Sequence, residues 1–128
     1  MSKNVLDASA IIALLEEEPG AEKLTDDVLA NSVASSVNVA EVQAWYVRDG
    51  AEPAETWKRI VFVIPEIIPF TDTHARVTGD LIAKTRKAGL SLGDRACIAL
   101  ASVVKGTAYT ADRPWLSLKL GVRIKSIR

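Results

Sequence analysis

The sequence predicts an α/β fold, a three-layer domain with a central parallel sheet of four to five short strands flanked by helices. Short apolar segments of strand length alternate with longer segments whose apolar residues recur at helical spacing. Glycine and proline residues punctuate this alternation, at Pro19, Gly20, Gly50 and Gly89. Strands that alternate with helices form a parallel sheet covered on both faces. The chain has 128 residues, the length of one domain, which we expect to span residues 1–128.

The first half of the chain begins with a short apolar strand and a helix that stops before a Pro-Gly pair. Ser35 or Ser36 can accept a hydrogen bond from a free backbone N–H and so cap the third helix, which ends at Gly50. In chain order, the expected elements are a strand at 3–6, helices at 8–17 and 21–29, a strand at 31–34 and a helix at 37–49.

The second half continues the same alternation. Pro53 suits the first turn of a helix, and Asp72 or Thr73 can cap the next one. The segment DRACIALASVVK is apolar nearly all round, which is typical of a buried central helix. The expected elements are helices at 53–64, 72–87 and 94–105 and strands at 67–70, 107–110 and, as the optional fifth, 123–127.

The composition is that of a soluble cytoplasmic protein, with 48% hydrophobic and 25% charged residues. Apolar runs are too short to span a membrane, and the N-terminus lacks the layout of a signal peptide. Cys97 is the single cysteine, so no internal disulfide can form. The net charge is zero, but residues 84–128 carry ten bases and two acids. This basic third either meets a polyanion or consists of solvated helix ends, and charge alone favours the second.

Four carboxylates stand at unusual positions in the sequence: Asp7, Glu41, Asp94 and Asp112. Asp7 follows the first strand in VLDASAIIALL, and Asp112 follows the strand at 107–110. The carboxyl ends of parallel strands share one edge of the sheet, where ligands bind. Asp94 opens the most apolar helix, and Glu41 is the only charge in NVAEVQAW. We therefore expect the four carboxylates to converge on one site.

Each of these carboxylates also has a purely structural explanation. Asp7 and Asp94 can cap helices, and Asp112 can organise the turn before Pro114. Glu41 gains nothing from capping but can be half exposed. For any single carboxylate a structural role is at least as well supported as a functional one, whereas four such carboxylates together favour a functional site.

A converging set of carboxylates needs a cation, because like charges disfavour ionisation. Mg²⁺ or Mn²⁺ accepts carboxylate and water oxygens, lowers the pKa of bound water and neutralises charge on a phosphate. Such chemistry needs no histidine or thiol, which agrees with one histidine, His74, expected at the surface or behind the site, and one buried cysteine. The absence of GxGxxG after the first strand argues against dinucleotide binding, and Ser9 argues against a phosphotransferase that needs a second aspartate there.

The motifs VLDASA, helical AEV, SLGDRACIALA and TADRPW, in that order, resemble the PIN domain family and, more narrowly, VapC toxins of toxin–antitoxin pairs. The resemblance spans residues 4–128 and implies a PIN-like α/β sandwich. It makes Asp7 and Asp94 direct metal ligands, with Glu41 and Asp112 completing the acidic pocket, all four being the catalytic set. The positions matched by Ser9 and Thr110 orient these carboxylates, whereas Asn38 departs from a threonine common in the family, with little expected consequence.

The resemblance implies a metal-dependent endoribonuclease that acts as a VapBC-type toxin and cuts RNA by metal-activated water, leaving a 5′-phosphate and a 3′-hydroxyl. A metal-dependent DNA nuclease and a non-catalytic PIN-like RNA-binding module remain as alternatives. The implied cofactor is Mg²⁺, with Mn²⁺ as the other candidate. The implied partners are an RNA substrate, a VapB-like antitoxin and a second copy in a homodimer, without a membrane.

Two further groups of residues have open roles. Arg95 and Arg113 stand beside acidic residues, where each can hold a phosphate or, as we favour, pair with a carboxylate. Four aromatic residues on early helices can form a partner interface, although core packing is favoured for at least half of them: Trp45, Tyr46, Trp57 and Phe62.

Overall fold

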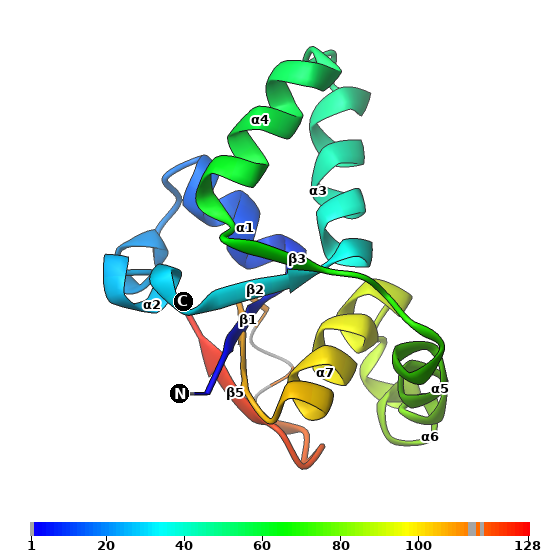
Figure 1. Ribbon diagram of the computed structural model, residues 1–128. Helices are drawn as coiled ribbons and strands as arrows, with labels where there is room; N and C mark the ends of the chain where they lie inside the picture. The colour runs from blue at the N-terminus through cyan, green and yellow to red at the C-terminus, as the bar shows by residue number, and fades with distance from the viewer. Residues whose placement is uncertain (1, 113–114, 116) are drawn as a thin grey trace.

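A single five-stranded parallel sheet runs through the centre of the molecule, as the computed structural model shows for residues 2–112, 115 and 117–128 (Figure 1). The strand order is β3-β2-β1-β4-β5, so the first strand lies in the middle. All four neighbouring pairs are parallel, which confirms the predicted α/β fold with a parallel sheet. The strands are β1 (Asn4–Leu6), β2 (Ser32–Ser35), β3 (Glu66–Ile68), β4 (Thr107–Thr110) and β5 (Arg123–Ser126).

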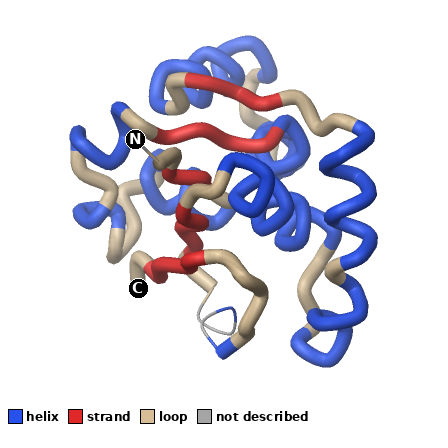
Figure 2. The backbone as a smooth tube through the Cα atoms, turned by 60° about the horizontal axis from the view of Figure 1, so that its bottom comes forward, coloured by secondary structure: helices blue, strands red, loops and turns tan. Residues whose placement is uncertain are grey.

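Helices cover both faces of the sheet, which gives the expected three layers (Figures 1 and 2). The α-helices are α1 (Ala8–Leu15), α2 (Asp26–Ala30), α3 (Ser36–Arg48), α4 (Pro53–Val63), α5 (Asp72–Asp80), α6 (Ile82–Thr85) and α7 (Leu92–Val104). Short 3₁₀ helices in the described part of the chain include η1 (Ala21–Lys23) and η2 (Arg86–Ala88). In Figure 1, α1, α3 and α4 lie on one side of the sheet, and α5, α6 and α7 lie on the other.

Two hydrophobic cores lie on opposite faces of the sheet, because successive strand residues point to opposite sides. Leu6 belongs to the core beneath α1, α3 and α4, whereas its neighbour Val5 belongs to the core beneath α7. Buried apolar residues occupy much of α7, including Ile98 and Leu100, which confirms its prediction as a central buried helix. The C-terminal ends of β1 and β4 are thereby fixed side by side, with Leu6 paired to Tyr109.

Two expected helices are shorter than the sequence pattern predicted. The helix expected at 21–29 is divided, because Thr25 caps a new helix by accepting a hydrogen bond from the Val28 N–H. The helix expected at 72–87 is capped by Thr71 rather than Asp72 or Thr73. It ends at Asp80 after a glycine, and the chain continues through α6 and η2. In the described part of the chain, no helix is long and apolar enough to span a bilayer.

Candidate acidic active site

Asp7 lies directly after β1 and is almost completely buried, with 2% of its surface exposed. Its backbone N–H donates to the Tyr109 carbonyl, which extends the β1–β4 pairing by one residue. Its Oδ1 accepts hydrogen bonds from the Ala10 N–H and the Ser9 hydroxyl, both at 2.7 Å, and its Oδ2 accepts one from the Thr110 hydroxyl at 2.6 Å. Asp7 therefore caps α1, as its structural explanation proposed, and the same carboxylate stands at the sheet edge where ligands bind.

The ionisation of Asp7 is set by two opposing effects. Burial raises its pKa from 3.8 to about 6, even though the hydrogen bonds from Thr110, Ala10 and Ser9 lower it. The negative charge of Asp94 raises it further. A buried carboxylate with a raised pKa at a sheet edge is a recognised mark of a functional site.

Two hydroxyl groups tie Asp7 to the segment that follows β4. The Ser9 Oγ accepts a hydrogen bond from the Ala111 N–H at 2.9 Å, and the Thr110 Oγ1 accepts one from the Asp112 N–H at 2.9 Å. The two hydroxyls lie 3.3 Å apart. Ser9 and Thr110 thus orient Asp7 and place the half-buried Asp112 next to it.

Glu41 is held against α7 by a buried asparagine on its own helix. The Asn38 Nδ2 donates to Glu41 Oε1 at 3.0 Å and to the Gly93 carbonyl at 2.9 Å, so it joins α3 to the first turn of α7. A Cβ on Gly93 would lie only 2.2 Å from each Glu41 carboxylate oxygen. Burial raises the pKa of Glu41, the hydrogen bond from Asn38 lowers it, and the charge of Asp94 raises it. Position 93 therefore has to be glycine for Glu41 to lie where it does.

Asp94 is the third residue of α7, not its cap. Ser91 is the capping residue, and its hydroxyl accepts from the Asp94 N–H at 3.1 Å while Asp94 Oδ2 accepts from the Ser91 N–H at 2.9 Å. This capping box satisfies two free donors at the helix start. Asp94 is half-buried, and its charge raises the pKa of both Asp7 and Glu41.

Asp7, Glu41 and Asp94 all act electrostatically on the buried Cys97. Burial raises the pKa of the Cys97 thiol well above 9.0, and the charges of Asp7, Asp94 and Glu41 raise it further. Asp94 thus lies within electrostatic reach of both Asp7 and Glu41, whereas Asp112 is tied to the site by its backbone N–H, which donates to the Thr110 hydroxyl.

The donor set suits a hard divalent cation, since it consists of carboxylate oxygens. Within residues 2–112, 115 and 117–128, no three histidine, cysteine or acidic side chains are arranged as a ready-made metal cluster. The reason lies in the hydrogen bonds: Asp7 points both oxygens at the protein, and Asp94 turns one toward Ser91. Glu41 and Asp94 are the more accessible pair, and Asp7 keeps one lone pair for a cation on Oδ2, which accepts a single hydrogen bond.

Asn38 and Gly93 contribute more to this site than the sequence suggested. Asn38 is 1% exposed, and its Oδ1 has no hydrogen-bond partner within the described chain. An unpaired buried acceptor costs about 1–3 kcal/mol, so the two donated bonds serve the placement of Glu41 at some cost in stability. The signal available in the sequence was the three-residue spacing of Asn38 and Glu41 on one helical face.

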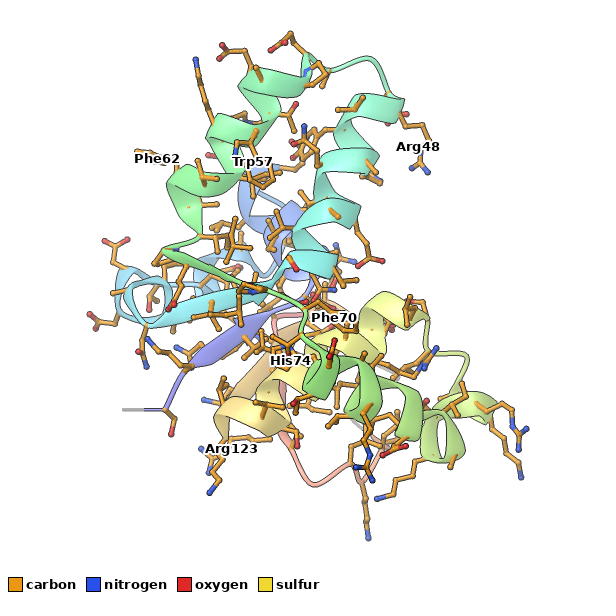
Figure 3. All side chains as sticks on the ribbon, turned by 45° about the vertical axis from the view of Figure 1, so that its right-hand side comes forward. Arg48, Trp57, Phe62, Phe70, His74 and Arg123 are labelled. Carbon is orange, nitrogen blue, oxygen red and sulfur yellow. The ribbon has the colours of Figure 1, made fainter. Side chains whose placement is uncertain are left out.

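One prediction about a side chain near the site is wrong, and of the two places expected for His74 the surface is excluded. Arg95 donates to the Thr78 carbonyl at 3.0 Å and forms no ion pair with a carboxylate in the described part of the chain, because its side chain turns toward α5. His74 does not lie at the surface but is 5% exposed on α5, where it contacts Phe70 edge to face (Figure 3). Arg113, like Pro114, lies outside the described residues.

The early aromatic residues divide between the core and the surface. Tyr46 lies in the core, and Trp45 is half-buried against it. Trp57 and Phe62 lie on α4, where they are 44% and 89% exposed (Figure 3).

Comparison with solved structures shows how widely this fold recurs. The crystal structure of DNA-bound VapBC from Salmonella typhimurium has a TM-score of 0.78 at 18% identity, with 100% of both chains covered. VapBC-5 from Mycobacterium tuberculosis gives 0.63 at 22% identity, covering 100% of this chain and 99% of the other. Mycobacterium tuberculosis VapC20, a sarcin-ricin loop cleaving toxin, gives 0.73 at 15%, covering 94% and 99%. At these identities the likeness concerns the fold.

Comparison of the sequence with curated proteins gives no significant match. The model of the PIN domain family, in contrast, matches residues 5–118, a range that runs from within β1 to beyond β4 and includes all four carboxylates. With the parallel sheet and the acidic edge described above, this match shows that the chain belongs to the PIN domain family.

Proposed function

We propose that this protein is a metal-dependent endoribonuclease and the toxin of a VapBC-type toxin–antitoxin pair. The proposal rests on one observation above all: a buried aspartate at the sheet edge, with its pKa raised to about 6, lies within the electrostatic reach of Asp94. Glu41 is coupled to the same Asp94 charge. Uncompensated acids of this kind reduce stability, so their grouping favours a role in binding a cation.

The residues of the site divide the work in this proposal. Asp7 and Asp94 bind the cation directly, and Glu41 and Asp112 complete the acidic pocket, with the Asp112 backbone N–H bonded to the same Thr110 hydroxyl that donates to Asp7. Ser9 and Thr110 hold Asp7 in one orientation and favour its charged form, since both hydrogen bonds lower its pKa. A bound Mg²⁺ or Mn²⁺ would supply an activated water and neutralise negative charge on the phosphate.

RNA as the substrate and an antitoxin as the partner are supported by the comparisons. VapC20 shares this fold and is a sarcin-ricin loop cleaving toxin, and VapBC complexes from several bacteria share it too. The exposed aromatic side chains Trp57 and Phe62 on α4 offer an apolar surface for a VapB-like antitoxin or for a second copy in a homodimer. We propose that the protein acts in the cytoplasm.

The test is cleavage of a structured RNA mixture and of a matched single-stranded DNA by the purified protein. Cleavage is measured with Mg²⁺, with Mn²⁺ and with EDTA, for the wild type and for Asp7→Asn and Asp94→Asn. The matched control is Asp49→Asn, because Asp49 is an exposed aspartate at the end of α3, outside the acidic site. We expect metal-dependent cleavage of RNA that both site variants lose and the control keeps.

Other outcomes contradict specific parts of the proposal. Cleavage of DNA in preference to RNA would make the protein a DNA nuclease. Metal binding without cleavage of any RNA would favour the non-catalytic RNA-binding module. Cleavage that survives both site substitutions would mean that the acidic site is not the catalytic one.

A further inference from the structure

An open groove begins at the acidic site and extends along α1 and α3. Its volume is about 420 Å³, and it is lined in part by Ser9 and Asp112, which also belong to the acidic site. The other walls include Ile12, Trp45 and the pair Glu18 and Arg128. This volume falls within the range of about 300–1,000 Å³ of small-ligand sites. The groove is therefore large enough for one nucleotide and continuous with the residues proposed to cut.

Trp45 lies one helical turn beyond Glu41 on the same face of α3. Residues spaced by four along a helix are neighbours, with Cβ atoms about 5–6 Å apart. The indole of Trp45 is held by an edge-to-face contact with Tyr46, whose ring centre is 5.0 Å away at an interplanar angle of 86°. Tyr46 is itself fixed, because its hydroxyl donates to Glu16 Oε2 at 2.6 Å. The indole of Trp45 is thus held in place one helical turn from Glu41 of the acidic site.

Three charged side chains line the groove: Asp112 at the acidic site, and Glu18 and Arg128, which form an ion pair at the groove's edge. Arg128 Nη2 lies 3.0 Å from Glu18 Oε1, and both side chains remain more than one-third exposed. A guanidinium carries five N–H donors, so this pair leaves donors of Arg128 available. The groove therefore combines an apolar wall, an aromatic side chain and a positioned guanidinium.

We propose that this groove is a nucleotide subsite, in which a base flanking the cleaved bond stacks on Trp45 and Arg128 donates to that nucleotide's phosphate. The inference deepens the proposed ribonuclease function and rests on it. Single-stranded RNA is bound in this way in general, with unstacked bases on aromatic side chains and backbone phosphates on cationic ones. Stacking of this kind tolerates every base, so Trp45 contributes affinity, not sequence selectivity.

The test uses adenosine, AMP and ribose 5-phosphate as probes with the metal-free protein in EDTA. Ligand-observed NMR reports binding, and tryptophan fluorescence reports stacking. Trp45→Leu removes the ring but keeps an apolar side chain, and Arg128→Gln removes the charge at an exposed position. Trp57→Leu is the matched control, because Trp57 lies on α4 and does not line the groove. Thermal unfolding of each variant reports whether the fold is intact.

We expect adenosine and AMP to quench the tryptophan fluorescence of the wild type and of Trp57→Leu, and the quenching to saturate with ligand concentration. Trp45→Leu should lose this quenching and bind adenosine at least about fivefold more weakly, as expected for loss of one stacked base. AMP should bind more tightly than adenosine, and Arg128→Gln should remove the difference. In RNA cleavage, Trp45→Leu should raise KM and leave kcat nearly unchanged.

The outcomes separate this subsite from the proposed function. Nucleotide binding at Trp45 without any RNA cleavage would refute the proposed nuclease function and support the subsite. RNA cleavage with an unchanged KM in a folded Trp45→Leu variant would refute the subsite and support the nuclease function. Equal binding of ribose 5-phosphate and AMP would show an anion site without a base. No nucleotide binding at all would overturn the subsite and favour a protein partner in the groove.

Discussion

Replacement of Gly93 by alanine separates the position of Glu41 from the stability of the fold. The new Cβ would lie 2.2 Å from both Glu41 oxygens, a distance that real contacts do not show. Because Glu41 is an exposed, flexible side chain, we expect its carboxylate to swing into solvent and lose its hydrogen bond with Asn38. The rest of the site, with Asp7 anchored by its own hydrogen bonds, should stay in place.

Two terms of similar size act on stability in Gly93→Ala. Gly93 lies in the first turn of α7, where alanine is favoured over glycine by at most the about 1 kcal/mol of a helix interior. Loss of the Asn38–Glu41 hydrogen bond costs about 1 kcal/mol of stability. This value is lower than for a buried hydrogen bond to a charged group, because the Glu41 carboxylate is exposed. The net change should therefore stay within about 1 kcal/mol of zero. Loss of a positioned carboxylate should lower divalent-cation affinity by about 10- to 100-fold, the usual effect of disturbing groups around a metal.

Urea unfolding and Mn²⁺ titration calorimetry measure these two quantities on the same samples. Gly79→Ala is the matched control, since no atom of the described residues lies within 4 Å of a Cβ at this helical position of α5. It should gain about 0.5–1 kcal/mol of stability and keep its Mn²⁺ affinity. In a Glu41→Ala background, Gly93→Ala should stabilise like the control and cause no further loss of Mn²⁺ affinity.

The reasoning is refuted if Gly93→Ala folds normally and binds Mn²⁺ as tightly as the wild type. The position of the Glu41 carboxylate beside Gly93 would then contribute nothing to Mn²⁺ affinity. A loss of affinity that is undiminished in the Glu41→Ala background would show that Gly93 acts by another route.

The remaining predictions concern Asp7 and the groups around it. Thr110→Val removes the hydroxyl that donates to Asp7 Oδ2, so the pKa of Asp7 should rise further, which an NMR titration of the carboxyl carbon would detect. Asn38→Ala should weaken Mn²⁺ binding by about 10- to 100-fold in calorimetry but have little effect once Glu41 is already Ala. Asp7 also makes metal-free stability depend on pH: its folded pKa of about 6 exceeds the 3.8 of the unfolded chain, so the ionised group destabilises the fold above pH 6 by up to about 3 kcal/mol. Asp7→Asn should thus be more stable than the wild type at pH 7.5 in EDTA, and the gap in free energy of unfolding should close as the pH falls from 6 to 4; a gap independent of pH would contradict this.

Local patterns in the sequence were sufficient to predict the strands and the edge on which the site lies. The strand at 107–110 was predicted with the bounds that β4 has, because its threonine and tyrosine residues favour a strand and a glycine and a polar turn lie on either side. Asp7 was placed correctly at the sheet edge, since it follows a strand directly. Helix ends were less predictable, as in the division at Thr25, where a side-chain cap outweighed helical spacing.

Contacts between distant segments could not be read from local patterns. Arg95 stands beside Asp94 in the chain, yet its guanidinium reaches the Thr78 carbonyl on another helix. The hydrogen bond from Asn38 to the Gly93 carbonyl joins residues 55 positions apart, and neither segment contains a sequence pattern that predicts it. Such pairings depend on how α3, α5 and α7 pack, which only the assembled fold determines.

The bond between the Thr110 hydroxyl and Asp7 spans 103 positions of the chain. During synthesis Asp7 emerges among the first residues, but its partner strand β4 follows only after α7. Contacts of such long range form late in folding, because the intervening chain must first be ordered. A nascent chain that still lacks β4 can therefore hold neither the orientation of Asp7 nor the position of Asp112. If the protein cuts RNA, the ribosome that makes it is exposed to an active nuclease only after β4 has been made.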